Sequence, residues 1–400
     1  MKGRKYTMNF DELKKTEAEN LMPTYGRFPV DLDHGQGATA WSGDGTPYID
    51  FGSGIGVNAL GYCDQGWVEA VEHQLKKLQH TSNLYYSAPQ IRLAEKLCRL
   101  TGMDKVFFGN SGAEANECAV KLARKYSFDK YGPGRDKILT LVNSFHGRTV
   151  TTLSATGQAV FHNYFFPFTG GFSYVEAGDL AATEQAADDT VCAVMLELIQ
   201  GEGGVRPLDK AYIDAVAKLC EARDILLLVD EVQTGVGRTG TLLAAEQYGI
   251  SPDVVTLAKG LGGGLPIGAC LCAARLGGVM GPSTHGSTFG GNPVAAAGAA
   301  YILDTVGTPG FLQGVREKSE TIRTRLTALQ NVKEVRGLGL MVGIDLVNGD
   351  AKTAAGRCLE QGLLVLTAKS SLRLLPPLNI SGEELNRGLD ILCGVIGSLS

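Results

Sequence analysis

Long apolar runs are missing from this chain of 400 residues, and none approaches the ~18 residues that a membrane-spanning helix needs. Its first segment, Met1 to Asn20, is polar and of mixed charge, without the apolar centre of a signal peptide. Basic residues form no stripe with interleaved aromatics, and the net charge is -5. These absences predict a cytoplasmic protein whose partners include neither a membrane nor a nucleic acid.

The nine cysteines show no C-x-x-C pair and no His/Cys spacing typical of metal ligands. The closest two, Cys270 and Cys272, lie in an apolar run that resembles a strand. An odd, unpatterned number of cysteines is typical of proteins from a reducing compartment. The sequence therefore predicts neither a disulfide framework nor a metal site.

Glycine, by contrast, is abundant: the 53 glycines gather in short clusters between apolar runs, as expected for many tight turns. Through the middle of the chain, short apolar runs alternate with segments of helical spacing. This alternation favours an α/β fold with a mostly parallel sheet and flanking helices. The predicted strands are 106–108, 138–142, 191–196, 225–229, 254–257 and 269–273, and the clearest helical patterns cover 115–126 and 213–220.

The last hundred residues mix strands with helices, which indicates a smaller α+β domain. Because 400 residues exceed what one hydrophobic core usually holds, we expect two domains. We predict a large domain of residues 61–294 and a small domain formed by both chain ends, 1–60 and 295–400. The patterns behind the small domain are helices at 315–329 and 385–396, the second opened by a Ser381-x-x-Glu384 capping box, and strand-like runs at 335–343, 363–366 and 372–375.

Two charged residues follow predicted strands of the large domain. Asp230 comes directly after the run 225–229, and Lys259 follows the run 254–257 and precedes a glycine cluster. Ligands of open α/β sheets bind beyond the carboxyl ends of the strands, so we expect both side chains at that edge. Pyridoxal phosphate requires a lysine for its Schiff base and an acid for its pyridinium nitrogen. The pair therefore predicts a site for that cofactor.

A phosphate site is predicted where strand 106–108 meets the next helix. Ser111 and Glu114 fit a capping box, and Gly112 allows close approach of the backbone to an anion. An ordinary capped helix would show the same pattern. A second glycine-rich turn, 286–293, offers two hydroxyl groups and ends in the Asn-Pro pair typical of a helix start.

A third glycine-rich segment, Gly235 to Gly240, matches the G-x-G-x-x-G pattern of dinucleotide-binding proteins. It does not follow a strand directly, because Asp230 to Thr234 intervene, and no helix clearly begins at its third glycine. We therefore do not expect a nicotinamide-dependent dehydrogenase.

Six segments, in order along the chain, resemble the class III pyridoxal-phosphate-dependent aminotransferases. They are 110–116, 144–149, 199–204, 230–235, 257–259 and 285–293. Three further segments, 25–30, 82–86 and 372–378, are similar to members that act on acetylornithine. The resemblance implies fold type I, with a large cofactor domain and a small domain from both chain ends, usually in a homodimer.

The resemblance also implies which residues hold pyridoxal phosphate. Lys259 would form the Schiff base and move the substrate proton, and a low pKa of this lysine would help because the neutral amine reacts. Asp230 would keep the ring nitrogen protonated. The remaining contacts are implied for the phosphate (Ser111, Gly112, Ala113 and, from the neighbouring subunit, Thr288), the ring faces (Phe145 and Val232) and the phenolic oxygen (Gln233).

Two arginines would bind substrate carboxylates, for which the bidentate guanidinium is well suited. Arg148 stands where the family holds the α-carboxylate of the donor or the distal carboxylate of glutamate. Arg373 stands where the family binds the α-carboxylate of glutamate and 2-oxoglutarate. Glu202 resembles the family's gate, which pairs with Arg373 while the donor is bound and swings away for glutamate.

Substrate choice depends on a further group of residues: Tyr25, Ile55 and Ser287. Ile55 stands where ornithine aminotransferases carry a tyrosine, and an apolar residue there suits a donor whose α-amine is acylated. The resemblance therefore implies transfer of the δ-amino group of N-acetylornithine to 2-oxoglutarate, as in arginine biosynthesis.

Several alternatives remain at this level. Succinylornithine, succinyl-diaminopimelate, acetyl-lysine, ornithine and 4-aminobutyrate are alternative donors that differ in the pocket they need. Glutamate-semialdehyde aminomutase is an alternative from another reaction class, and it would need no 2-oxoglutarate. A noncatalytic cofactor-binding protein is a third, although the intact Lys259 and Asp230 speak against it.

Overall fold

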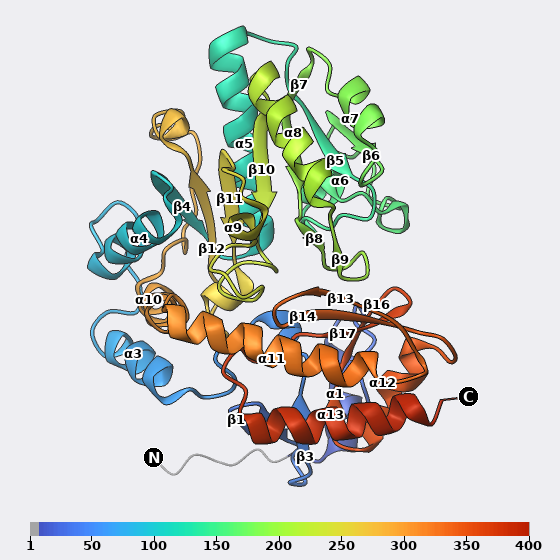
Figure 1. Cartoon of the computed structure of the whole chain (residues 1–400). Coiled ribbons are helices and arrows are strands. Elements are labelled where there is room, and N and C mark those ends of the chain that lie inside the picture. Colours follow the sequence, from blue (N-terminus) through green and yellow to red (C-terminus); the bar gives the residue numbers. More distant parts are fainter. Residues whose placement is uncertain (1–7, 400) are drawn as a thin grey trace.

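A computed structural model describes residues 8–399 of the chain, and its larger part is built around a seven-stranded sheet (Figure 1). All strands of this sheet run parallel except β12, which is antiparallel to both of its neighbours. The mostly parallel α/β sheet is thereby confirmed. In spatial order its strands are β4 (Lys105–Gly109), β12 (Gly268–Cys272), β11 (Val254–Leu257), β10 (Leu226–Asp230), β7 (Val191–Leu196), β5 (Lys137–Leu141) and β6 (Phe172–Val175).

Helices cover both faces of this sheet, which explains why its central strands are continuous apolar runs. Along β10, Leu226 and Leu228 pack on the side of α5 (Gly112–Tyr131), whereas Leu227 and Val229 pack on the side of α8 (Lys210–Arg223). By the same alternation Asp230 points to the α5 side. Shorter elements complete this part: α6 (Val150–Ala155), η1 (Ala159–Phe161), α7 (Leu180–Ala186), β8 (Ile199–Gln200), β9 (Arg206–Pro207), α9 (Ala244–Tyr248), η2 (Lys259–Leu261) and η3 (Ala274–Leu276).

A second, smaller sheet lies below the first in Figure 1 and is antiparallel throughout. Its strands, in order, are β13 (Val332–Leu338), β14 (Met341–Leu346), β17 (Ser371–Leu374) and β16 (Leu366–Ala368), and the accompanying helices are α11 (Pro309–Thr327), α12 (Ala351–Glu360) and α13 (Gly382–Gly397). The capping box at Ser381 and Glu384 opens α13 as predicted.

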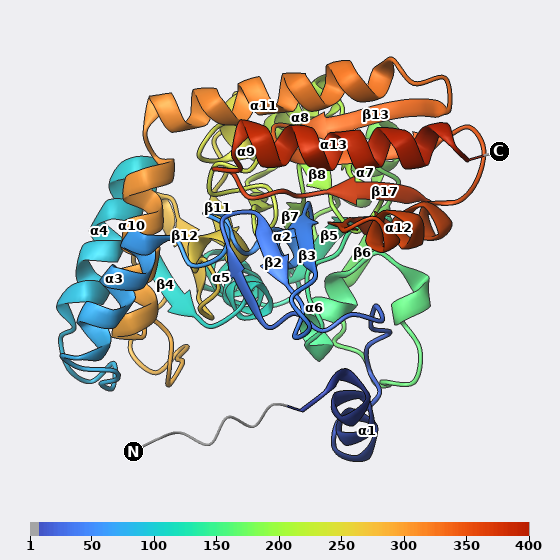
Figure 2. The same cartoon turned by 90° about the horizontal axis from the view of Figure 1, so that it is seen from below.

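The two chain ends meet in a further four-stranded sheet (Figure 2), where β15 (Leu363–Leu364) pairs with the N-terminal β3 (Pro47–Asp50). Its other strands are β1 (His34–Gln36) and β2 (Thr39–Trp41). Asn292 caps α10 (Pro293–Val306), which packs against α3 (Gln65–Leu75) and α4 (Ala88–Thr101). The domain limits 61–294, 1–60 and 295–400 stay a prediction, and residues 1–7 and 400 lie outside the described residues.

The helix α1 (Phe10–Asn20) stands away from the body of the chain and buries none of its residues (Figure 2). Within residues 8–399, no helix is both long enough and apolar enough to cross a membrane.

Candidate active site

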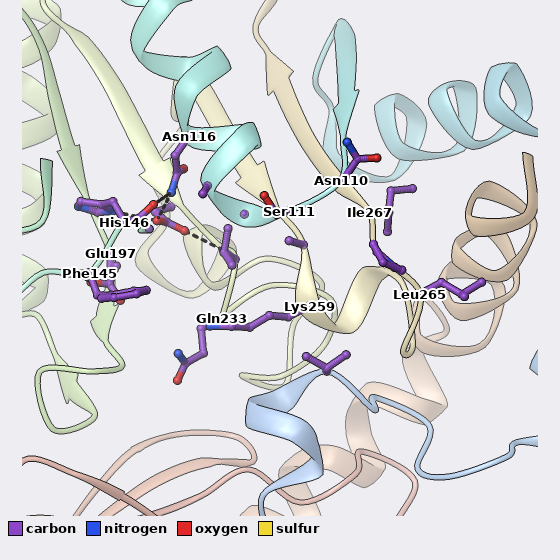
Figure 3. A pocket seen from close by; sticks show the side chains of 18 of the residues that line it. Asn110, Ser111, Asn116, Phe145, His146, Glu197, Gln233, Lys259, Leu265 and Ile267 are labelled. Carbon is purple, nitrogen blue, oxygen red and sulfur yellow. Dashed lines mark hydrogen bonds and ion pairs between the residues drawn. The ribbon is translucent and has the colours of Figure 1, made fainter. Parts of the chain in front are cut away.

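The ends of β10 and β11 lie side by side, with Asp230 opposite Thr256 in the register. Lys259 follows at the start of η2, with a positive φ of 43° that a lysine rarely adopts. Such backbone strain is common at functional sites. Asp230 and Lys259 line one cavity of about 330 Å³, shown in Figure 3. Asp230 and Lys259 therefore lie together beyond the carboxyl ends of their strands, as predicted.

The Asp230 carboxylate is almost fully buried, yet three donors bind it. The Asn116 amide and His146 Nδ1 both lie 2.8 Å from Oδ2, and the Val232 backbone N–H donates to Oδ1 at 3.0 Å. Thr256 donates to the Asn116 amide oxygen at 2.7 Å and thereby turns the amide nitrogen toward Asp230. These donors replace the water that burial removes from the Asp230 carboxylate.

Lys259 reaches into the cavity from η2 (Figure 3). Desolvation by the surrounding protein lowers the pKa of its amine, and the nearby Arg373 guanidinium acts in the same direction. The carboxylates of Glu202 and Asp230 oppose this shift. A larger fraction of neutral, nucleophilic amine results, which is what Schiff-base chemistry requires.

The predicted phosphate loop opens α5 on the other side of the cavity. Ser111 Oγ accepts the Glu114 N–H at 3.2 Å, as a helix cap should. The predicted capping box is incomplete, however, because the Glu114 carboxylate binds the N–H of Asn110 at 2.6 Å and not that of Ser111. A Cβ on Gly112 would lie 2.7 Å from a methyl of Val232, so glycine is required there. The N–H groups of the first turn lack helical acceptors and form an anion site.

The cavity gathers almost all residues that the sequence assigned to the cofactor. Those that line it are Ser111, Gly112, Ala113, Phe145, Asp230, Val232, Gln233 and Lys259. Thr288 is the exception, because it is exposed and lies outside the cavity of its own chain. Ser287 is closer: its Oγ accepts from the side chain of Asn110, which lines the cavity, at 3.1 Å.

The two predicted substrate arginines have opposite surroundings. Arg373, on β17, is buried, and its Nη1 lies 2.5 Å from Glu202 Oε1. Arg148 is exposed, and its guanidinium carbon lies 5.4 Å from the ring centre of Phe145. The structure thus contains the ion pair expected of a gate, whereas Arg148 is open to solvent.

Tyr25 and Ile55 line a second cavity, of about 420 Å³, together with residues of α12 and β15. Ile55 belongs to α2 (Ser53–Gly56), a short turn in which every residue has a positive φ. Val57, which directly follows α2, lines the cavity that contains Lys259. The α2 turn therefore lies between this cavity and the second one. The Gly235 to Gly240 segment forms no dinucleotide loop, because the next helix begins only at Ala244.

Sequence reasoning assigned no role to three polar residues of the site: Asn116, His146 and Glu197. Glu197 accepts the backbone N–H groups of Phe145 at 2.8 Å and of Gly201 at 3.1 Å, and burial raises its pKa to about 7. The signal for Glu197 was present, because Glu197 directly follows the buried strand β7, and Asp230 likewise stands at the carboxyl end of the buried strand β10. Asn116 is a polar residue on an otherwise apolar helix face.

Known proteins are similar to this chain over nearly its whole length. Residues 21–396 match the family "Aminotransferase class-III". The chain is 52% identical to acetylornithine aminotransferase of Haemophilus ducreyi over 98% of this chain and all of the relative, and 44% identical to succinylornithine transaminase of Citrobacter koseri over 96% and 94%. The crystal structure of N-acetylornithine aminotransferase from Stenotrophomonas maltophilia superposes with a TM-score of 0.83 at 38% identity, covering 96% of this chain and 98% of that one. The protein whose cavity joins Lys259 to Asp230 therefore belongs to the class-III aminotransferase family.

Proposed function

We propose that this protein transfers the δ-amino group of N-acetylornithine to 2-oxoglutarate and releases N-acetylglutamate 5-semialdehyde and glutamate, a step of arginine biosynthesis. The single observation that carries the proposal is the pair of unlike arginines near one lysine-containing cavity. Arg373 is buried against Glu202, and Arg148 is open. An enzyme that must accept an ω-amine and an α-amino acid in turn needs two such carboxylate sites. The similarity to acetylornithine aminotransferases supports the choice of donor.

The residues of the cavity fit pyridoxal phosphate, which the family implies. The anion site at the start of α5 suits its phosphate, Asp230 suits the ring nitrogen, and Phe145 and Val232 offer apolar contact to the ring. Gln233 suits the phenolic oxygen. Bound there, the cofactor would supply an electron sink for charge that develops on the substrate carbon.

Lys259 has two tasks in this proposal. Its amine, with a lowered pKa, would hold the cofactor covalently while no substrate is bound. Once free, the same amine would take the proton from the substrate carbon that carries the nitrogen and would deliver it to the cofactor carbon to which that nitrogen is joined. Asp230, oriented by its hydrogen bonds to Asn116 and His146, would accept a hydrogen bond from the protonated ring nitrogen during this transfer.

Arg148, Arg373 and Glu202 separate the two half-reactions. The donor carboxylate binds Arg148 while Glu202 neutralises Arg373. In the second half-reaction the α-carboxylate of 2-oxoglutarate replaces Glu202 on Arg373, and Arg148 takes the distal carboxylate. One cavity thereby serves two substrates of different charge.

A second copy of the chain completes the site in this proposal. Thr288 is exposed and would reach the phosphate of the neighbouring copy. Large apolar side chains near it are also exposed: Phe289 at 60%, Leu84 at 87% and Tyr86 at 99%. Exposed apolar groups of this size are typical of a protein interface and support a homodimer with shared sites.

Succinylornithine is the second candidate donor, because a succinylornithine transaminase is also similar over nearly the whole chain.

The proposed function is tested by mixing cofactor-loaded protein with single amines in the absence of a keto acid and following the visible absorption of the cofactor. Rapid loss of this band with N-acetylornithine, and slow loss with ornithine and 4-aminobutyrate, is expected. Faster reaction with succinylornithine would reassign the donor, and no reaction with any amine would refute the transferase proposal.

A further inference from the structure

Arg148 is held by aromatic rings and not by a carboxylate. Its guanidinium carbon lies 4.1 Å from the ring centre of Phe161 and 5.4 Å from that of Phe145. Within residues 8–399 it forms no ion pair, whereas Arg373 is neutralised by Glu202. A ring face attracts a guanidinium through its quadrupole and uses none of its N–H groups. The donors of Arg148 therefore remain available to an incoming anion.

The position of the Phe161 ring is fixed independently of Arg148. Phe161 ends η1, and its N–H donates to the carbonyl of Gln158 at 3.0 Å. The Gln158 side chain donates in turn to the carbonyl of Ser144 at 3.0 Å, one residue before Phe145. The rings of Phe145 and Phe161 meet edge to face, with centres 6.2 Å apart. The hydrogen bonds hold the main chains of Phe161 and Phe145 close together, and the edge-to-face contact orients the two rings on which Arg148 rests.

We propose that Phe161 is a positioning residue for substrate binding: its ring holds Arg148 in place with the N–H edge open to the donor carboxylate. This inference rests on the proposed function, because that proposal assigns the donor carboxylate to Arg148. An arginine without such a support samples many rotamers in water, and substrate binding must then overcome the entropy of ordering it. An ion pair would order the side chain too, but it would occupy the groups that the substrate needs.

Phe161→Leu removes the ring and retains a large apolar side chain. A cation–π contact at an exposed site contributes on the order of 0.5–1 kcal/mol and a desolvated one about 2 kcal/mol, so kcat/KM for N-acetylornithine should fall by about 2- to 30-fold. Phe161→Tyr keeps the ring and should stay within about twofold of the wild type. Phe165→Leu is the matched control, because Phe165 lies in the same loop, is 58% exposed and packs on Tyr164.

N-acetylputrescine distinguishes carboxylate binding from general damage, because it is N-acetylornithine without the carboxylate. Its kcat/KM, low in all variants, should be the same in Phe161→Leu and in the wild type. Equal losses for both amines would overturn the inference. A second readout does not depend on turnover: calorimetric titration with N-acetylnorvaline, which keeps the carboxylate and lacks the reactive amine, should show the same weakening.

A double-mutant cycle with Arg148→Gln tests whether Phe161 affects donor binding through Arg148. In that background, Phe161→Leu should cause no further loss, because the guanidinium that it positions is gone. A loss as large as in the wild-type background would overturn the inference. If the wild type does not convert N-acetylornithine, the proposed function fails. The cycle is then run with the best carboxylate-bearing amine and its decarboxylated counterpart, so the two failures are distinguishable.

Discussion

Replacing Glu202 with alanine should destabilise the protein and, at the same time, tighten the binding of 2-oxoglutarate. Arg373 is 3% exposed, and Glu202 is its only carboxylate partner among residues 8–399, at 2.5 Å. The next acceptor, Gln233 Oε1, lies at 3.5 Å, and the Arg373 Nε has no partner. Removing one partner of a buried pair typically costs about 3–5 kcal/mol. Because the Glu202 side chain is 31% exposed and water can replace it, we expect a loss of about 1–3 kcal/mol.

The same pair competes with the acceptor. A hydrogen bond to a charged group contributes about 1.5–3 kcal/mol net, and 2-oxoglutarate must break this one before it can bind Arg373. Without Glu202 that cost disappears, so KM for 2-oxoglutarate should fall by about tenfold or more. The N-acetylornithine half-reaction loses the group that neutralises Arg373 and should not improve. The ratio of the two kcat/KM values should therefore shift toward the α-amino acid pair.

Steady-state kinetics with each substrate varied in turn give the KM values, and chemical denaturation gives the free energy of unfolding. Glu334→Ala is the control: Glu334 binds Arg336 at 3.0 Å, but Arg336 keeps a second carboxylate, Asp345, at 2.7 Å. This variant should lose less than about 1 kcal/mol and leave the kcat/KM ratio unchanged. An unchanged ratio in Glu202→Ala, or a raised KM for 2-oxoglutarate, would refute the gate.

Three other predictions concern single side chains. Lys259→Ala should abolish both the visible absorption of the bound cofactor and turnover; measurable turnover would contradict its role. Burial raises the pKa of Glu231 to about 7 from its usual 4.5, so the folded chain binds a proton that the unfolded chain has lost between these pH values. Its contribution to stability is complete below about pH 4.5 and is lost as the pH rises through about 7, and Glu231→Gln should flatten the fall in unfolding free energy over this range by on the order of 3 kcal/mol. Parallel curves for the two proteins would contradict this. Cys63 is the one exposed cysteine among the nine, so native protein should show one fast thiol per chain toward a disulfide reagent, and Cys63→Ser should remove it.

Local structure was largely predictable from the chain. The six predicted strands of the large sheet correspond to β4, β5, β7, β10, β11 and β12, because strands buried on both faces leave continuous apolar runs. The edge strand β6 was missed, since Phe172–Val175 is short and only its last residue is buried, so it leaves no continuous apolar run in the sequence. Helix starts at Ser381 and Asn292 were correct because a cap is a local contact.

The site itself was predictable only in part. Asp230 and Lys259 came together because Asp230 ends β10 and Lys259 follows β11, and these parallel strands end at one edge of the sheet. The network around Asp230 was not predictable from spacing, since Asn116 lies 114 residues away and His146 lies 84 residues away. The roles of the substrate residues came from family resemblance and remain proposals.

The sequence by itself determined six of the seven strands of the large sheet, the helix caps at Ser381 and Asn292, and the α/β class, because each depends on neighbours within a few positions. Only the tertiary structure decided which polar groups stabilise Asp230, that Glu202 closes on Arg373 across 171 residues, and that Arg148 rests on Phe161. These contacts depend on the order of the strands in the sheet and on how the chain ends fold back on the large sheet. Neither the strand order nor the packing of the chain ends produces a periodic pattern in the sequence, because many long-range contacts together stabilise both.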